Sequence, residues 1–105
     1  MNHEYEAQEP KREEVDQLEG PTLLEFGNAW CGYCRAAQPH IESALASRPG
    51  LRHLKIADAS GRRLGRSFRV KLWPTLIVMR GGEEVARVVR PQGAGEIGAA
   101  LAKLG

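Results

Sequence analysis

Residues that could build a metal site or a disulfide network are scarce in this 105-residue chain, which has two cysteines and three histidines. A structural zinc needs four ligands, and the spacing of His3, His40 and His53 does not complete a site with the cysteine pair. We therefore expect neither a metal nor another cofactor. A purely structural disulfide is also disfavoured, because a bridge across so few residues constrains the unfolded chain little.

Long apolar runs are absent as well, and aromatic residues make up only 6% of the chain. A helix needs about 20 apolar residues to cross a membrane, so we expect no membrane association. The N-terminus, residues 1–6, is acidic and lacks the apolar segment of a secretion signal. Two cysteines gathered in one motif suit a compartment in which thiols stay reduced. These absences predict a cytoplasmic protein.

The net charge of +2 conceals a separation of acidic from basic residues along the chain. Residues 1–25 carry eight acidic side chains and two basic ones, whereas residues 48–71 carry eight basic side chains and a single acidic one. A charged run is most often a solvated face, but a basic surface also suits an acidic partner. The arginines that would form such a surface are Arg62, Arg63, Arg66 and Arg69. Only Phe68 offers a stacking ring in this run, so we expect no nucleic acid to bind there.

The hydrophobic pattern predicts one domain in which strands and helices alternate. Strands are expected where apolar and β-branched residues cluster, at 22–27, 51–57, 75–79 and 84–89. Helices are expected at 10–19, 34–47 and 94–104, with a short basic helix or a pair of turns at 60–68. This order predicts an α/β fold over residues 10–105, with a central mixed sheet and helices on both faces. Residues 1–9 are polar, and we expect them to be poorly ordered.

The chemistry is expected at Cys31 and Cys34, which follow the first predicted interior strand. A cysteine at the N-terminus of a helix lies where unpaired N–H groups and the helix dipole favour negative charge. We therefore predict that Cys31 is the nucleophilic thiolate. Cys34 lies one helical turn further along and can close a disulfide with it. Such a pair accepts a substrate disulfide through a mixed disulfide and then releases itself by internal attack.

The motif Trp30-Cys31-Gly32-Tyr33-Cys34 after a strand, with Trp73-Pro74-Thr75 before a hairpin, resembles the thioredoxin family. The resemblance covers residues 10 to 104, and it implies the thioredoxin fold and a thiol–disulfide oxidoreductase. It also implies that a cis peptide bond precedes Pro74, which faces the two sulfurs. The backbone of Trp73 would then pair with an extended substrate. Pro39 matches the proline that kinks the helix after the motif in family members.

By the same resemblance, the substrate-binding surface consists of Trp30, Gly32, Tyr33, Trp73 and Pro74. Within it, Trp30 is expected to pack beside the sulfurs as a shield more than to bind substrate. Tyr33 is exposed between the cysteines, and either contacts substrate or is merely tolerated there.

Glu25 stands six residues before Cys31, where many thioredoxins have a buried aspartate. In an interior strand, we expect Glu25 to exchange a proton with Cys34 when that thiol attacks or leaves. The alternative is a glutamate whose longer side chain reaches solvent and takes no part in the chemistry.

Several positions depart from the family pattern. Tyr33 replaces the usual proline, and the resulting Cys-Gly-Tyr-Cys looks like the motif of bacterial disulfide isomerases. Gly27 stands where a second tryptophan is common, and Trp73 is bulky where a smaller β-branched residue is usual. The run Arg90-Pro91-Gln92 occupies the region where an apolar residue and a glycine usually border the substrate groove.

These features predict a monomeric cytosolic reductant whose substrates are disulfide-bearing proteins and whose electron donor is a reductase. Two alternatives stay open. Tyr33 favours an oxidant or isomerase, because the residues between the cysteines tune the reduction potential. The basic stretch 62–71 favours a binding module that keeps the fold and docks one acidic partner.

Overall fold

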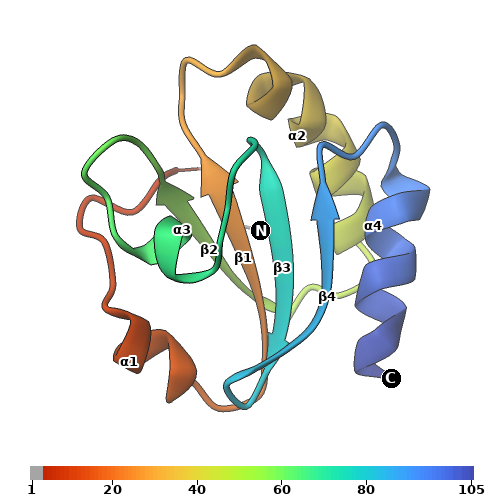
Figure 1. The fold of residues 1–105 in the computed structure, drawn as a ribbon. Coiled ribbons are helices and arrows are strands. Elements are labelled where there is room, and N and C mark those ends of the chain that lie inside the picture. Colours follow the sequence, from red (N-terminus) through yellow and green to blue (C-terminus); the bar gives the residue numbers. More distant parts are fainter. Residues whose placement is uncertain (1–3) are drawn as a thin grey trace.

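The computed structural model describes residues 4–105, which fold into a four-stranded sheet covered by helices (Figure 1). The strands are β1 (Pro21–Gly27), β2 (Arg52–Ala57), β3 (Thr75–Arg80) and β4 (Glu83–Val89). The helices are α1 (Arg12–Asp16), α2 (Gly32–Leu45), α3 (Leu64–Ser67) and α4 (Ala94–Leu101), followed by the 3₁₀ turn η1 (Ala102–Leu104). No helix within the described residues is both long and apolar enough to span a membrane.

The strand order is β2-β1-β3-β4, which places β1 inside the sheet. β1 runs parallel to β2 and antiparallel to β3, and β3 pairs with β4 as an antiparallel hairpin. The turn of this hairpin is Gly81-Gly82, and both glycines have the positive φ that side chains disfavour. The mixed α/β sheet expected from the sequence is thus confirmed.

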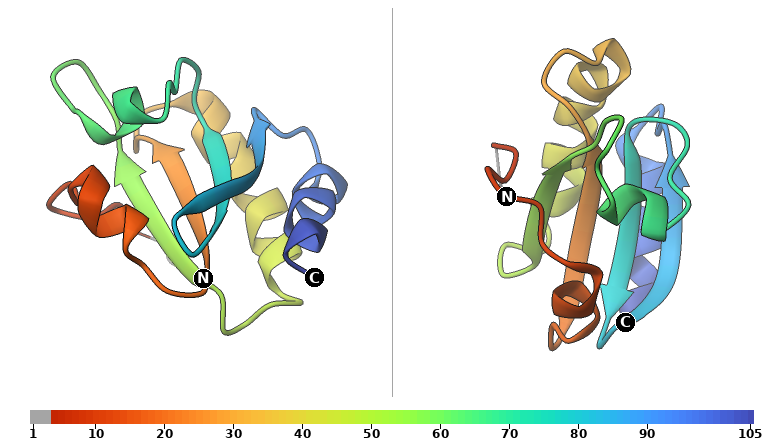
Figure 2. Two further views of the ribbon diagram at one scale, coloured as in Figure 1. Left: turned by 60° about the horizontal axis from the view of Figure 1, so that its bottom comes forward. Right: turned by 60° about the vertical axis from the view of Figure 1, so that its left-hand side comes forward.

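Alternate residues of the inner strands point into two cores on opposite faces of the sheet. On one face, Leu23 packs with residues of α2 and α4. On the other face, its neighbour Leu24 packs with Val15 of α1 and Leu64 of α3. Figure 2 shows the two pairs of helices on either side of the sheet. Because both faces of β1 are covered, packing fixes the position of its C-terminal end, from which the chain continues to α2.

The helices on the α1 side are shorter than expected. α1 covers 12–16 instead of 10–19, and Val15 is its only buried residue, so little packing holds a longer helix in place. In the basic segment 60–68, one four-residue helix forms, α3.

On the opposite face, α2 begins at Gly32, before the expected start at Cys34, because the sulfur of Cys31 caps the helix. Pro39 lies inside α2, and the kink expected there stays a prediction. The last helix ends at Leu101 and tightens into the η1 turn, as final helical turns often do.

The segment before α1 lies along the outer edge of β2. Residues 1–3 lie outside the described part of the chain, and the poor order expected for 1–9 stays a prediction. Further along, the N–H of Glu6 donates to the carbonyl of Lys55 at 2.7 Å. The carboxylate of Glu9 accepts the N–H groups of Arg63 and Leu64 at the start of α3. With these contacts in place, the Tyr5 side chain lies beside Gly27, the last residue of β1.

Candidate active site

The two cysteines occupy different environments at the N-terminus of α2. Cys31 is the N-cap residue, and its sulfur accepts the N–H of Cys34 at 3.2 Å. Cys31 is partly exposed, whereas only 1% of the Cys34 surface is exposed; both are free thiols. Among residues 4–105, no three His, Cys, Asp or Glu side chains lie close enough together to hold a metal ion. An outer thiol that receives a main-chain N–H, with a buried thiol one turn away, suits stepwise disulfide exchange.

The Cys34 sulfur is enclosed by Cys31, the backbone of Gly27 and the Tyr5 side chain. A Cβ on Gly27 would lie 2.5 Å from Cys34 Sγ and 3.1 Å from the Tyr5 hydroxyl oxygen, so these two atoms fill that space. Burial raises the pKa of the Cys34 thiol to about 12, and its hydrogen bond with Cys31 adds to the rise. The Tyr5 hydroxyl donates a hydrogen bond to the same sulfur, which lowers the Cys34 pKa. The pKa of Tyr5 is itself raised by burial and by the nearby Cys34 and Glu25.

Glu25 is wholly buried in β1, and its carboxylate has three polar neighbours. His53 Nε2 lies 2.8 Å from Oε1, Gln38 Nε2 donates to Oε2 at 2.9 Å, and Lys55 Nζ lies 3.9 Å from Oε2. Gln38 also donates to the carbonyl of Cys34 at 2.9 Å and accepts from Lys55 Nζ at 3.1 Å. The carboxylate is therefore linked to the second cysteine through Gln38. The alternative in which the Glu25 side chain reaches solvent is wrong.

The sequence motifs do not identify the other members of this network, although two of them leave a signal. His53 and Lys55 are two residues apart on β2, and the register pairs Lys55 with Glu25, so strand alternation places both on one face. Gln38 follows Cys34 by one helical turn, so it lies on the same side of α2. Tyr5 comes from the N-terminal segment, and no spacing connects it to the cysteines.

Trp73 and Pro74 form the corner that leads into β3, and the peptide bond between them is cis. The indole Nε1 of Trp73 donates to Asp58 Oδ2 at 2.9 Å, and its carbonyl accepts Arg90 Nε at 2.8 Å. The Arg90 guanidinium carbon also lies 3.9 Å from the centre of the Tyr33 ring. The Arg90 side chain thus contacts both the cysteine motif and the corner formed by Trp73 and Pro74. That Pro74 faces the sulfurs stays a prediction.

Trp30 and Tyr33 leave large apolar surfaces open beside the cysteines. The two residues are 73% and 60% exposed. That Trp30 packs beside the sulfurs as a shield stays a prediction. Gly32 adds no side chain, and nothing lies within 4 Å of where its Cβ would be. Exposed rings at such a place are typical of a surface that contacts a partner.

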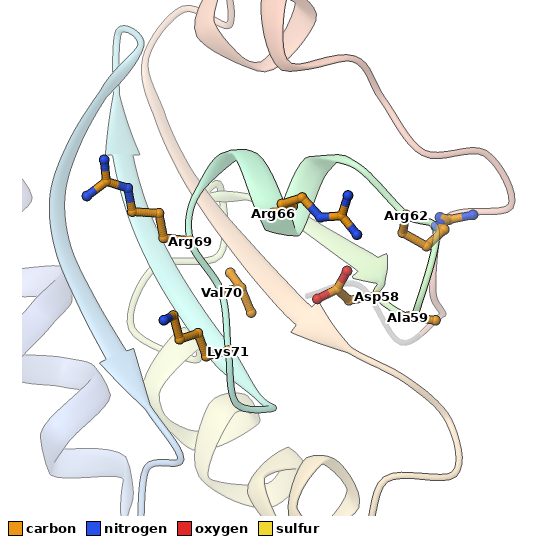
Figure 3. Close-up of a pocket in the computed structure, with 7 residues that line it drawn as sticks. All are labelled: Asp58, Ala59, Arg62, Arg66, Arg69, Val70 and Lys71. Atoms are coloured by element: carbon orange, nitrogen blue, oxygen red, sulfur yellow. The ribbon is translucent and has the colours of Figure 1, made fainter.

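The basic stretch contributes to a pocket of about 400 Å³ beside α3 (Figure 3). The charged residues that line it are Asp58, Arg62, Arg66, Arg69 and Lys71. In Figure 3, the Arg66 side chain extends toward Asp58, whereas Arg69 and Lys71 extend on the other side of Val70. Arg63 belongs to a separate hollow that Glu9 and Arg12 also line. Three of the four expected arginines therefore share one pocket.

A family model and several known proteins match this chain. The thioredoxin family model matches residues 4–103 of the chain. The structure of thioredoxin 2 from Pseudomonas aeruginosa PAO1, in its reduced form, has a TM-score of 0.88 and 53% sequence identity. That match covers 99% of this chain and 96% of the Pseudomonas chain.

Curated sequences agree over a shorter region. Thioredoxin from Chlamydia pneumoniae is 37% identical over 70 residues, which are 67% of this chain and 69% of that protein. Thioredoxin H2-1 from Oryza sativa subsp. japonica is 31% identical over 67 residues, or 64% of this chain. The aligned region spans 49% of the rice protein, about half of its length.

Proposed function

This chain belongs to the thioredoxin family, a family of thiol–disulfide oxidoreductases, and on that premise we propose that it reduces protein disulfides with Cys31 and Cys34. The observation that carries the proposal is the pairing of two free thiols with different exposure at the start of α2. Cys31 is open to a substrate, and Cys34 is held within reach of Cys31 but closed to solvent.

The reaction has two exchange steps. The Cys31 thiolate attacks one sulfur of the substrate disulfide, so that a Cys31–substrate disulfide forms and the other substrate sulfur leaves as a thiolate. Cys34 then loses its proton and attacks the Cys31 sulfur, which forms the Cys31–Cys34 disulfide and releases the second substrate thiolate. Two electrons pass to the substrate. A reductase must then return two electrons to the protein, as thioredoxin reductase does in this family.

The proton of Cys34 is the obstacle in the second step, because burial raises the pKa of this thiol to about 12. The hydrogen bond from the Tyr5 hydroxyl favours the thiolate as it forms. Glu25 is the nearby carboxylate, and Gln38 links it to the Cys34 backbone. We assign Tyr5 to stabilising the Cys34 thiolate and Glu25 to accepting its proton.

The substrate is proposed to lie over the exposed rings of Trp30 and Tyr33 and beside the corner of Trp73 and Pro74. An extended strand suits this corner because main-chain pairing holds peptides of varied sequence. We further propose that the protein acts as a monomer, since one chain supplies both cysteines and the groups around them. A cytoplasmic setting would keep the pair reduced between turnovers.

A trapping experiment tests the proposal. Cys34→Ser removes the resolving thiol, so the substrate should stay attached to Cys31 as a mixed disulfide. The sample is incubated with a disulfide-bearing protein such as insulin and resolved on a non-reducing gel. Cys31→Ser/Cys34→Ser is the matched control and should form no adduct. If Cys34→Ser also forms none, the exchange mechanism is refuted.

The oxidant or isomerase alternative concerns the direction of the same chemistry. Equilibrating the Cys31–Cys34 pair in glutathione buffers measures its reduction potential, which would distinguish a reductant from an oxidant or isomerase. A reduction potential of about −270 mV is typical of thioredoxin, and one of about −180 mV is typical of protein disulfide isomerase. The more oxidising value would favour the alternative in which the protein oxidises or isomerises disulfides.

The basic pocket favours a second candidate function, the docking of an acidic partner. Its described lining includes Arg62, Arg66, Arg69 and Lys71 together with the acidic Asp58. Asp58 also accepts the indole N–H of Trp73. A bound acidic segment would thus lie next to the corner proposed for substrate. Replacing Arg66 and Lys71 with glutamine should weaken capture of an acidic partner while leaving insulin reduction unchanged. The cysteine-free double variant should still capture that partner.

A further inference from the structure

Arg90 is placed where it contacts both parts of the proposed substrate surface. It follows β4 with a φ of +50°, and its main-chain N–H donates to the carbonyl of Pro74 at 2.9 Å. Its Nε donates to the carbonyl of Trp73 at 2.8 Å, and its guanidinium lies 3.9 Å from the Tyr33 ring centre. A residue other than glycine with such a φ is uncommon, and it persists where surrounding contacts hold it.

Within the part of the chain that the structure describes, no carboxylate forms an ion pair with Arg90. The hollow beside it is lined by Tyr33, Ala36, His40 and the run 90–92, and none of these described residues is acidic. The guanidinium carries five N–H donors in one rigid plane, and its hydrogen bond to Trp73 uses only the Nε–H. Such a group recognises a carboxylate, which it can bind through two parallel hydrogen bonds.

The same side chain also limits how substrate pairs with the corner. The Trp73 carbonyl is the backbone acceptor that an extended substrate would use, and Arg90 already occupies one of its two lone pairs. A neutral or basic peptide gains little by displacing Arg90. An acidic peptide gains a charged partner in exchange.

On the basis of the function proposed above, we propose that Arg90 is a specificity-determining residue. It selects peptide and protein disulfides that carry a carboxylate next to the reacting cysteine. In the first exchange step, the substrate carboxylate pairs with the guanidinium of Arg90 while the Cys31 sulfur forms its bond to the substrate sulfur. The second substrate sulfur leaves as a thiolate. The electron flow is that of the reduction itself, and Arg90 contributes position and charge only.

The test compares two peptides that differ in one charge. Each has a single cysteine activated as a 2-pyridyl disulfide, preceded by glutamate in one peptide and lysine in the other. Attack by Cys31 forms the peptide–Cys31 disulfide and releases 2-thiopyridone, whose absorbance gives the second-order rate constant. Each rate constant is divided by the one that dithiothreitol gives with the same peptide, which removes differences in intrinsic reactivity.

We expect the wild-type protein to prefer the glutamate peptide by about five- to tenfold at low salt, as charge-assisted hydrogen bonds of this kind allow. Arg90→Gln should abolish the preference while both peptides still react, and Arg90→Lys should restore part of it. Arg48→Gln, the same change of charge near the far end of α2, should leave it intact. In the wild-type protein, the preference for the glutamate peptide should also fall as sodium chloride is added, because salt screens the charges. This measurement requires no variant.

Two results would overturn the inference. One is a wild-type protein without a preference between the peptides, and the other is a preference that survives in Arg90→Gln. The second result would assign the selection to another cation near the motif, such as Arg35. If the wild-type protein releases thiopyridone from neither peptide, the proposed function fails as well.

Discussion

Replacing Gly27 with alanine would place a methyl group where the Cys34 sulfur lies. The added carbon would stand 2.5 Å from Cys34 Sγ and 3.1 Å from the Tyr5 hydroxyl oxygen. Non-bonded heavy atoms rest in contact at about 3.5–4.0 Å, so the methyl carbon or the sulfur must move by about 1–1.5 Å. Gly27 is fixed by its pairing with Ala57 in the sheet, and extra volume of this kind costs about 1–3 kcal/mol in a packed site. We expect the free energy of unfolding to fall by that amount.

Urea unfolding under reducing conditions measures this loss, and a double-mutant cycle assigns its cause. Cys34→Ala removes the clashing sulfur, so adding Gly27→Ala to that variant should cost much less than adding it to the wild type. The coupling should be about 1–3 kcal/mol. Gly98→Ala is the matched control. It adds the same methyl to an exposed position of α4 with no atom within 4 Å, so it should stabilise the protein by about 0.5–1 kcal/mol. Additive effects of Gly27→Ala and Cys34→Ala would refute the proposed packing.

Three further predictions concern the buried groups around the second cysteine. The Cys34 pKa of about 12 means that its reactive thiolate fraction falls about tenfold for each pH unit below that value. Iodoacetamide should therefore label only Cys31 in the reduced protein until the pH is strongly alkaline. Mass spectrometry of peptides locates the label, and equal labelling of both cysteines at pH 8 would contradict the raised pKa of Cys34. Tyr5→Phe removes the hydrogen bond that favours the Cys34 thiolate, so decay of the mixed disulfide, followed by stopped flow, should slow about five- to tenfold. Glu25→Gln leaves buried His53 and Lys55 without their carboxylate; unfolding in urea should show a loss of about 3 kcal/mol, and unchanged stability would argue against a charged cluster.

Much of the fold is predictable from local patterns in the sequence. All four strands fall at the predicted places within one residue at each end, since each combines β-branched residues with flanking turn signals. The first helix is overestimated, because helical propensity extends over residues 10–19 but burial of Val15 alone supports only a short helix. Propensity is local, whereas the end of a helix depends on what it packs against.

The candidate site is predictable only where a motif carries it. Cys31, Cys34 and Trp73-Pro74 are visible in the sequence because their chemistry requires those residues at short spacing. The positions of His53 and Lys55 become meaningful only with the parallel register of β1 and β2. Arg90 and Tyr5 act through contacts between distant segments. Their roles depend on tertiary packing, which no local pattern encodes.

Gly27 and Tyr5 have a consequence for anyone who moves this site to another scaffold. The hydroxyl that contacts the buried sulfur belongs to Tyr5, in the segment before α1, and the position beside that sulfur in β1 carries no side chain. A graft of residues 25–38 alone would therefore transfer both cysteines but leave a cavity beside Cys34 where the Tyr5 side chain lies. An affinity tag or a truncation close to residue 5 would alter the same spot, so a redox titration should be repeated on untagged protein.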